Sequence, residues 1–107
     1  MMVTEEKQIT AVENGTFDLV QGDFSPNDAL EIVTDLFSMK INFHEVKSFS
    51  QLIRFGAKDP DLLQRISELK IAQKQARELI NEAKESGKSV RVNSTISIEL
   101  IDSNASK

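Results

Sequence analysis

The feature that most constrains the fold is the run SVRVNSTISIELI, Ser89–Ile101, near the end of the chain. Its apolar residues alternate with polar ones: Val90, Val92, Ile96, Ile98 and Leu100. Because successive side chains of a strand point to opposite sides, this alternation predicts a half-buried β-strand. An exposed strand with an apolar face tends to aggregate unless it is paired. The run therefore requires a sheet, and its length exceeds what short neighbouring strands within the chain would cover.

Two segments carry the start signals of helices. In the first, Ser25 can accept a backbone N–H through its hydroxyl, and Pro26 loses nothing at the first helical position. Asp59-Pro60 repeats the signal, and Gly87 predicts the end of the second helix. Between them the residues are spaced as a heptad seam with one polar member: Leu62, Ile66, Leu69, Gln73, Ala76, Ile80 and Ala83.

The N-terminal part predicts a β-hairpin. Glu5–Glu13 is a weak strand, Thr16–Phe24 is the returning strand, and Asn14-Gly15 between them is typical of a type I′ turn. The 107 residues have the length of one domain, with residues 1–4 and 102–107 expected to be frayed. The predicted fold class is α+β: an N-terminal β-hairpin, two helices and a long C-terminal strand, forming one small antiparallel sheet with the helices packed on one face.

Composition disfavours several classes of protein. The formal net charge of -4 opposes diffuse binding to nucleic acid, which depends on clustered Lys and Arg. With one histidine, no cysteine and no ligand spacing or phosphate-binding motif, the sequence predicts no metal site, no cofactor and no catalytic set. No apolar run approaches membrane-spanning length and the start resembles no signal peptide, so the expected location is the cytoplasm.

The lone histidine lies on an unusual part of the first helix. Ala29, Val33, Leu36 and Phe37 form an apolar face, and the same face then carries Lys40, His44 and Lys47, while Val46, Phe49 and Ile53 rotate away. One interpretation is a break or bend, with Ser48-Phe49-Ser50-Gln51 as the capping box of a new short helix. The other is a small site for an anionic ligand, formed by Lys40, His44, Lys47 and Arg54. The sequence leaves both open.

The second helix carries a basic face with a helical spacing: Lys70, Lys74, Arg77 and Lys84. Acidic residues run beside it at Glu78, Glu82 and Glu85, so a solvated helix surface explains the pattern as well as a nucleic-acid contact does.

The sequence favours a non-enzymatic protein-interaction module, a small homo-oligomer with an unknown protein partner. Self-association would use the last strand, Ser89–Ile101, or the seam residues Leu62, Ile66, Leu69, Ala76 and Ile80, although that seam could equally pack on the first helix. Two alternatives are a nucleic-acid-associated regulator that uses Lys70, Lys74, Arg77 and Lys84, and an anion-binding protein centred on His44.

Overall fold

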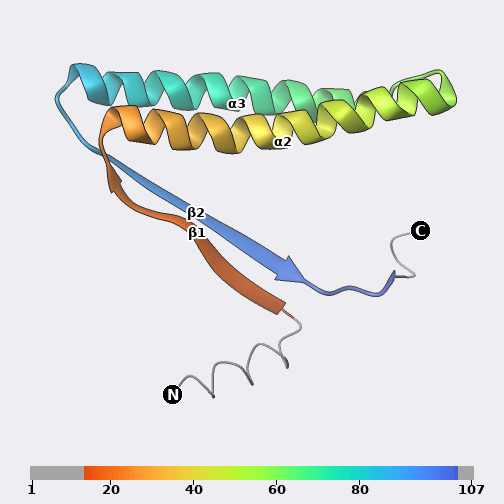
Figure 1. Cartoon of the computed structure of the whole chain (residues 1–107), viewed down its shortest axis with the longest axis horizontal. Coiled ribbons are helices and arrows are strands. Elements are labelled where there is room, and N and C mark those ends of the chain that lie inside the picture. The colour runs from red at the N-terminus through yellow and green to blue at the C-terminus, as the bar shows by residue number, and fades with distance from the viewer. Residues whose placement is uncertain (1–13, 104–107) are drawn as a thin grey trace. The chain divides into compact units, whose positions relative to one another are not determined.

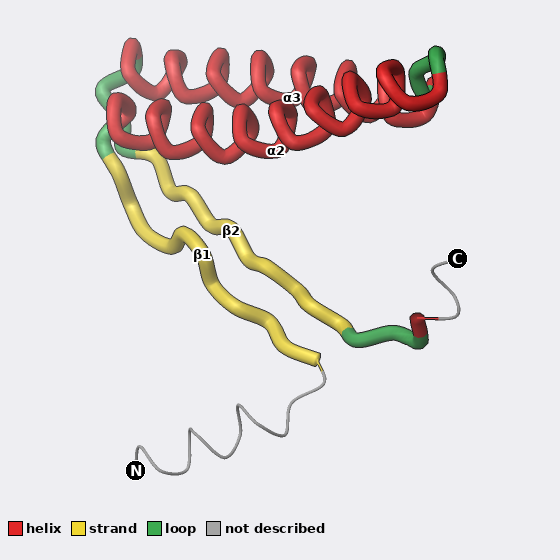
Figure 2. The backbone as a smooth tube through the Cα atoms, turned by 45° about the vertical axis from the view of Figure 1, so that its right-hand side comes forward, coloured by secondary structure: helices red, strands yellow, loops and turns green. Residues whose placement is uncertain are grey.

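The computed structural model describes residues 14–103, in which four elements follow one another (Figure 1). They are β1 (Asn14–Phe24), α2 (Pro26–Phe55), α3 (Pro60–Glu85) and β2 (Val90–Glu99). The helices lie side by side as a hairpin, and β1 and β2 form a two-stranded antiparallel sheet (Figures 1 and 2). The fold class is α+β, as predicted, and the last strand pairs with the strand that precedes the first helix.

The chain divides into two compact units. Within the described range, a ribbon unit consists of residues 14–22 and 92–103, and a helical unit consists of Asp23–Arg91. The predicted strand Glu5–Glu13 and the predicted frayed residues 1–4 lie outside the described residues. A single domain with the helices on one face of the sheet stays a prediction, because it concerns the placement of one unit against the other.

The turn predicted at Asn14-Gly15 is wrong, because both residues belong to β1. A type I′ turn needs positive φ at both positions, and positive φ in residues 14–103 occurs only at Gly22, Gly56 and Gly87. Gly15 instead makes room for an aromatic ring two residues further along the strand. A Cβ added to Gly15 would lie 2.6 Å from the Phe17 ring.

The start of α2 follows its capping signal. Ser25 is the N-cap, its Oγ accepts the backbone N–H of Asp28 at 3.2 Å, and Pro26 occupies the first turn. At the other end, Gly56 adopts φ 76°, and its N–H donates to the Leu52 carbonyl. Nothing lies within 4 Å of the place where a Cβ at Gly56 would be, so glycine serves the backbone conformation there and not a packing need.

The helix break predicted near Ser48 is wrong, because α2 continues from Pro26 to Phe55. Ser48 does not start a new helix; it is buried, with 3% of its surface exposed. No proline or glycine follows Pro26 before Gly56, so the backbone has no reason to leave the helix. The apolar residues that rotate away from the first face therefore remain on the same straight element and end up on its outer side.

The α3 helix has the predicted start and end. Asp59 Oδ1 accepts the Asp61 N–H at 2.9 Å. After the C-cap Ser86, the N–H of Lys88 donates to the Ala83 carbonyl at 2.9 Å while Gly87 adopts φ 69°, which is a Schellman motif.

The heptad seam of α3 packs on α2 and supplies the core of the helical unit. Ile66 and Leu69 are buried against Ile41 of α2, with Phe37 and Leu62 beside them. The polar seam residue Gln73 is also used within the chain. Its Nε2 donates to the Thr34 carbonyl at 3.1 Å and to the Ser38 hydroxyl at 3.0 Å. Of the two uses that the sequence left open for this seam, packing on the first helix is the one that the structure contains.

The predicted strand Ser89–Ile101 is present as β2, Val90–Glu99. Half-buried and exposed side chains alternate only in the first half of this strand. Val90, Val92 and Ser94 are half-buried and their neighbours exposed, but every residue from Thr95 to Glu99 is exposed. At the base of the strands, Arg91 Nε donates to Asp23 Oδ1 at 2.7 Å, and a second guanidinium nitrogen donates to Oδ2 at 3.1 Å. This two-point ion pair fixes the register of the strands where they leave the helices.

Candidate interaction surfaces

The four residues of the predicted anion site lie along one helix, α2, and differ in their exposure. Lys40, Lys47 and Arg54 are exposed along α2, while His44 is half-buried. The Lys40 ammonium lies 5.4 Å from the centre of the Phe43 ring. The centres of the His44 and Phe43 rings are 5.6 Å apart, in an edge-to-face arrangement. The cations therefore follow an apolar surface of the helix, and the histidine turns toward α3.

The electrostatics of His44 also oppose a cationic role. Both ring nitrogens are shielded from solvent and have no hydrogen-bond partner within residues 14–103. Burial lowers the pKa of His44 below its usual value, and the neighbouring charges of Lys40, Arg65 and Lys47 lower this pKa further. This direction favours the uncharged ring, which adds no positive charge for an anion.

His44 belongs to a polar seam on the inner side of α2. Its other members are Thr34, Ser48 and Gln51, and each has a buried oxygen without a hydrogen-bond partner in the described part of the chain. Burying polar atoms without partners costs free energy, so this seam weakens the packing of α2 on α3. It has no charge or ligand geometry that suggests chemistry.

The basic residues of α3 are exposed but not gathered into one positive surface. Lys70 Nζ forms an ion pair with the Glu45 carboxylate at 3.0 Å. Lys74 and Arg77 border a shallow hollow of about 220 Å³ that also contains Glu78, and Lys84 lies outside it. An acid thus accompanies three of the four predicted cations.

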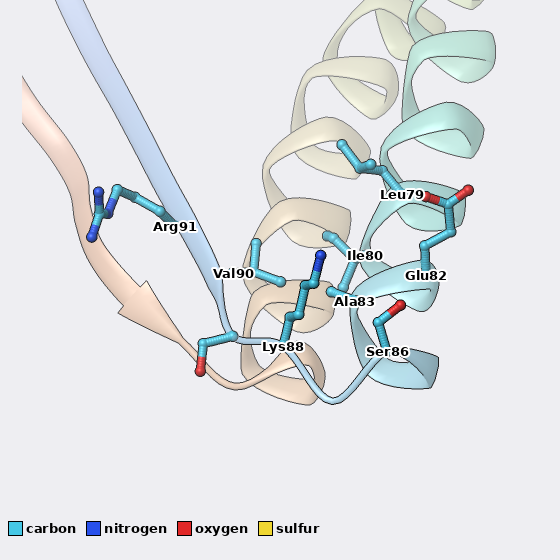
Figure 3. A pocket seen from close by; sticks show the side chains of 9 residues that line it. Leu79, Ile80, Glu82, Ala83, Ser86, Lys88, Val90 and Arg91 are labelled. Carbon is cyan, nitrogen blue, oxygen red and sulfur yellow. The ribbon is translucent and has the colours of Figure 1, made fainter.

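A second hollow, of about 330 Å³, lies where α3 ends and β2 begins. Figure 3 shows Ile80, Ala83 and Val90 grouped on its inner side, while Arg91 points away toward β1. Arg91 donates hydrogen bonds to Asp23; this interaction raises the pKa of Arg91 and lowers the pKa of Asp23. The lining is largely apolar and offers no set of groups for acid-base or nucleophilic chemistry.

Exposed apolar side chains are the most unusual surface feature. Seven of them lie on α2, and five of these seven form one line, which we name the outer stripe: Met39, Phe43, Val46, Phe49 and Ile53. Their exposed fractions run from 58% to 67%. On the ribbon unit, Phe17 and Leu19 of β1 and Ile96 and Ile98 of β2 are also exposed. By contrast, only five apolar residues in the described range are buried, and one of them is an alanine.

The outer stripe also has a signal in the sequence, which was not among the predictions above. Counting from Ile32, the spacing along α2 is the same heptad pattern that identified the seam of α3: Ile32, Leu36, Met39, Phe43, Val46, Ser50 and Ile53. Ile32, Leu36 and Ser50 are half-buried. The helix therefore carries a second seam on the side that does not face α3.

Residues 14–103 contain no group of three or more His, Asp or Glu side chains that could hold a metal ion. Neither α2 nor α3 combines the length and apolarity needed to cross a bilayer. No protein-family model matches the sequence, and no curated protein or solved structure matches it significantly.

Proposed function

We propose that this chain is a non-enzymatic protein-interaction module that associates with itself, with the ribbon of β1 and β2 as one contact element. The observation that carries the proposal is the large amount of apolar surface left exposed by a small buried core. Large contiguous apolar patches on a folded chain mark sites of interaction with other proteins. The proposed location is the cytoplasm.

The ribbon supports this proposal independently of the helices. A two-stranded sheet is marginally stable in water unless a further strand or a packed surface covers it. Every residue in the far half of β2 is exposed, including Ile96 and Ile98, and Phe17 and Leu19 are exposed on β1. Addition of strands from a second copy would satisfy the free backbone groups at the edges and cover these side chains.

Molar mass in solution tests the proposal. A monomer has a mass of 12.0 kDa, and we expect light scattering to give at least twice that value. Replacing Ile96 and Ile98 together with lysine should weaken the assembly, because two charges would be buried at the contact. The matched control replaces Thr95 and Ser97 with lysine, because both residues are exposed and occupy polar positions of the same strand. A mass of 12.0 kDa for the unchanged protein at high concentration would overturn the proposal.

The alternative of nucleic-acid binding has less support. The basic residues Lys70, Lys74, Arg77 and Lys84 are interleaved with acids on the same helix, and Lys70 is paired with Glu45. Nucleic-acid contacts that neutralise phosphates give an affinity that falls steeply with salt. Absence of any mobility shift with DNA or RNA at low salt would remove this alternative.

A further inference from the structure

The outer stripe of α2 has the geometry of a coiled-coil seam. Met39, Val46 and Ile53 repeat every seven residues, and Phe43 lies four residues after the first of them. The half-buried residues Ile32 and Leu36 continue the line toward the start of the helix. Two helices that carry such a repeat bury it against each other by inserting side chains between those of the partner.

The stripe lies on the side of α2 away from α3. The residues that meet α3 centre on Ile41 and Ser48, both buried. At about 100° per residue, the middle of the outer stripe is rotated roughly 160° from that face. The α3 helix therefore leaves the stripe free to meet another helix.

The residues that flank the stripe differ in charge between its two sides. One flank repeats a cation every seven residues, at Lys40, Lys47 and Arg54. The other flank carries Asp35 and Asn42 and then, at the same interval, Phe49, which is the member of the outer stripe at its edge. In a coiled coil these flanks are the e and g positions, which meet across the interface and set the partner and its orientation.

We infer that the outer stripe pairs with the same stripe of a second copy, with the two α2 helices parallel. This inference rests on the proposed self-association and names the surface that serves it on the helical unit. In a parallel pair each g residue meets the e residue five positions later on the partner helix. Asp35 then meets the lysine at position 40, Asn42 meets the lysine at 47, and the Phe49 ring meets the guanidinium at 54, a favourable cation–π contact.

The opposite orientation is disfavoured by the same charges. An antiparallel pair places e residues against e residues, which would bring Lys40, Lys47 and Arg54 against the same three cations of the partner. Like charges at such positions repel and select against the arrangement. Ser50, at a position facing the partner, adds a polar group of the kind that fixes register at some cost in stability.

One variant tests use of the stripe. Val46→Glu places a carboxylate in the middle of the stripe, and Ile71→Glu is the matched control on α3, since the two side chains have similar exposure, 59% and 55%. We expect Val46→Glu to raise the concentration at which the assembly half-dissociates at least about tenfold, and Ile71→Glu to change it much less. Circular dichroism checks that both variants remain helical.

Single cysteines test the orientation, because the chain has no cysteine of its own. In a parallel pair Met39→Cys and Ile53→Cys each form a disulfide with their own counterpart, since equivalent positions meet. In an antiparallel pair neither does so alone, but a mixture of the two variants forms a mixed disulfide. Gln75→Cys, exposed on α3, is the control for random collision.

The outcomes separate this inference from the proposed function. A monomeric unchanged protein overturns both. If the protein is an oligomer but Val46→Glu and Ile71→Glu half-dissociate at the same concentration, the role of the stripe is overturned. The proposed self-association is then still supported. Mixed disulfides without self-disulfides overturn the parallel pairing, and capture of a different protein's helix without self-association overturns the second copy as occupant.

Discussion

The two halves of α2 meet the same partner helix with different chemistry. In the first half Ala29 and Ile41 are buried and Phe37 packs beside them, and the polar groups of Thr34 and Ser38 accept hydrogen bonds from Gln73 of α3. In the second half the inner face carries His44, Ser48 and Gln51, whose buried polar atoms find no partner in the described residues. The apolar side chains of that half, including Phe43 and Ile53, face outward.

The second half of α2 therefore finds less apolar packing on α3 than the first half does. The seam of α3 is apolar toward α2 except at Gln73, which bonds to the first half of α2, so the mismatch in the second half originates in α2. Burial of apolar surface is the main favourable term in helix packing, and the second half of α2 gains little of it within the chain. A partner on its outer face would supply the missing burial.

The largest expected difference in the free energy of unfolding is between two isoleucine-to-alanine substitutions, one on each face of α2. Ile41→Ala removes side-chain atoms that are 7% exposed, and we expect the free energy of unfolding to fall by about 2–4 kcal/mol. Ile53→Ala removes the same atoms from a site that is 67% exposed, and the expected change is within about 0.5 kcal/mol for the monomer. Urea denaturation at low protein concentration measures both. Equal losses would mean that the two faces do not differ as described.

The next effect concerns Gln73, a half-buried polar residue that has hydrogen-bond partners on α2. Gln73 donates to the Thr34 carbonyl and the Ser38 hydroxyl in the first half of α2. Gln73→Ala loses both hydrogen bonds and some packing, and the expected loss is about 1–2 kcal/mol. Gln75→Ala, an exposed glutamine on the same helix, should cost almost nothing in the same denaturation experiment. If the two variants unfold alike, the bonds of Gln73 do not stabilise the hairpin.

A smaller change in the free energy of unfolding, of opposite sign, is expected from a substitution in the second half of α2. Ser48 is buried and its hydroxyl has no partner among residues 14–103, so Ser48→Ala removes a desolvated polar atom and improves helix propensity. We expect a gain of about 1 kcal/mol in thermal or urea unfolding. Ser67→Ala, exposed on α3, controls for propensity alone and should gain at most about 0.5 kcal/mol. A loss of stability in Ser48→Ala would show that the hydroxyl is satisfied after all.

The parts of the fold that sequence reasoning predicted are those with local causes. The caps at Ser25 and Asp59 and the glycine after α3 act within a few residues of the chain, and all three are present. The alternation of β2 and the heptad seam of α3 were found for the same reason, because periodicity is a property of one segment.

The parts that it did not predict depend on what a segment meets. The rotation of Val46, Phe49 and Ile53 away from the first face was interpreted as a possible break, on the assumption that one chain must bury its own apolar residues. The helix propensity of the segment and the lack of a breaker decide otherwise, and α2 continues with those side chains outside. The prediction at Gly15 was wrong for a similar reason, since this residue lies within β1 beside the Phe17 ring and not in a turn.

The last expected effect is a dependence of folding stability on pH, which arises in the second half of α2 alone. His44 lies in the polar seam of α2, and burial lowers its pKa, followed by the charges of Lys40, Arg65 and Lys47. The unfolded chain keeps a histidine pKa of about 6.5 and so binds a proton at a pH where the folded chain does not. Stability is therefore retained above about pH 6.5 and falls as the pH drops from there toward the folded pKa.

His44→Gln isolates this contribution, because glutamine cannot take up a proton. Stability of the unchanged protein and the variant is compared by urea unfolding at about pH 7.5 and about pH 5.5, values that bracket the histidine range. The unchanged protein should lose more stability than the variant between the two values, since carboxylates titrate equally in both. If the losses match, His44 is protonated as easily in the folded chain as in the unfolded one, and the inner face of the second half is open to water rather than closed by α3.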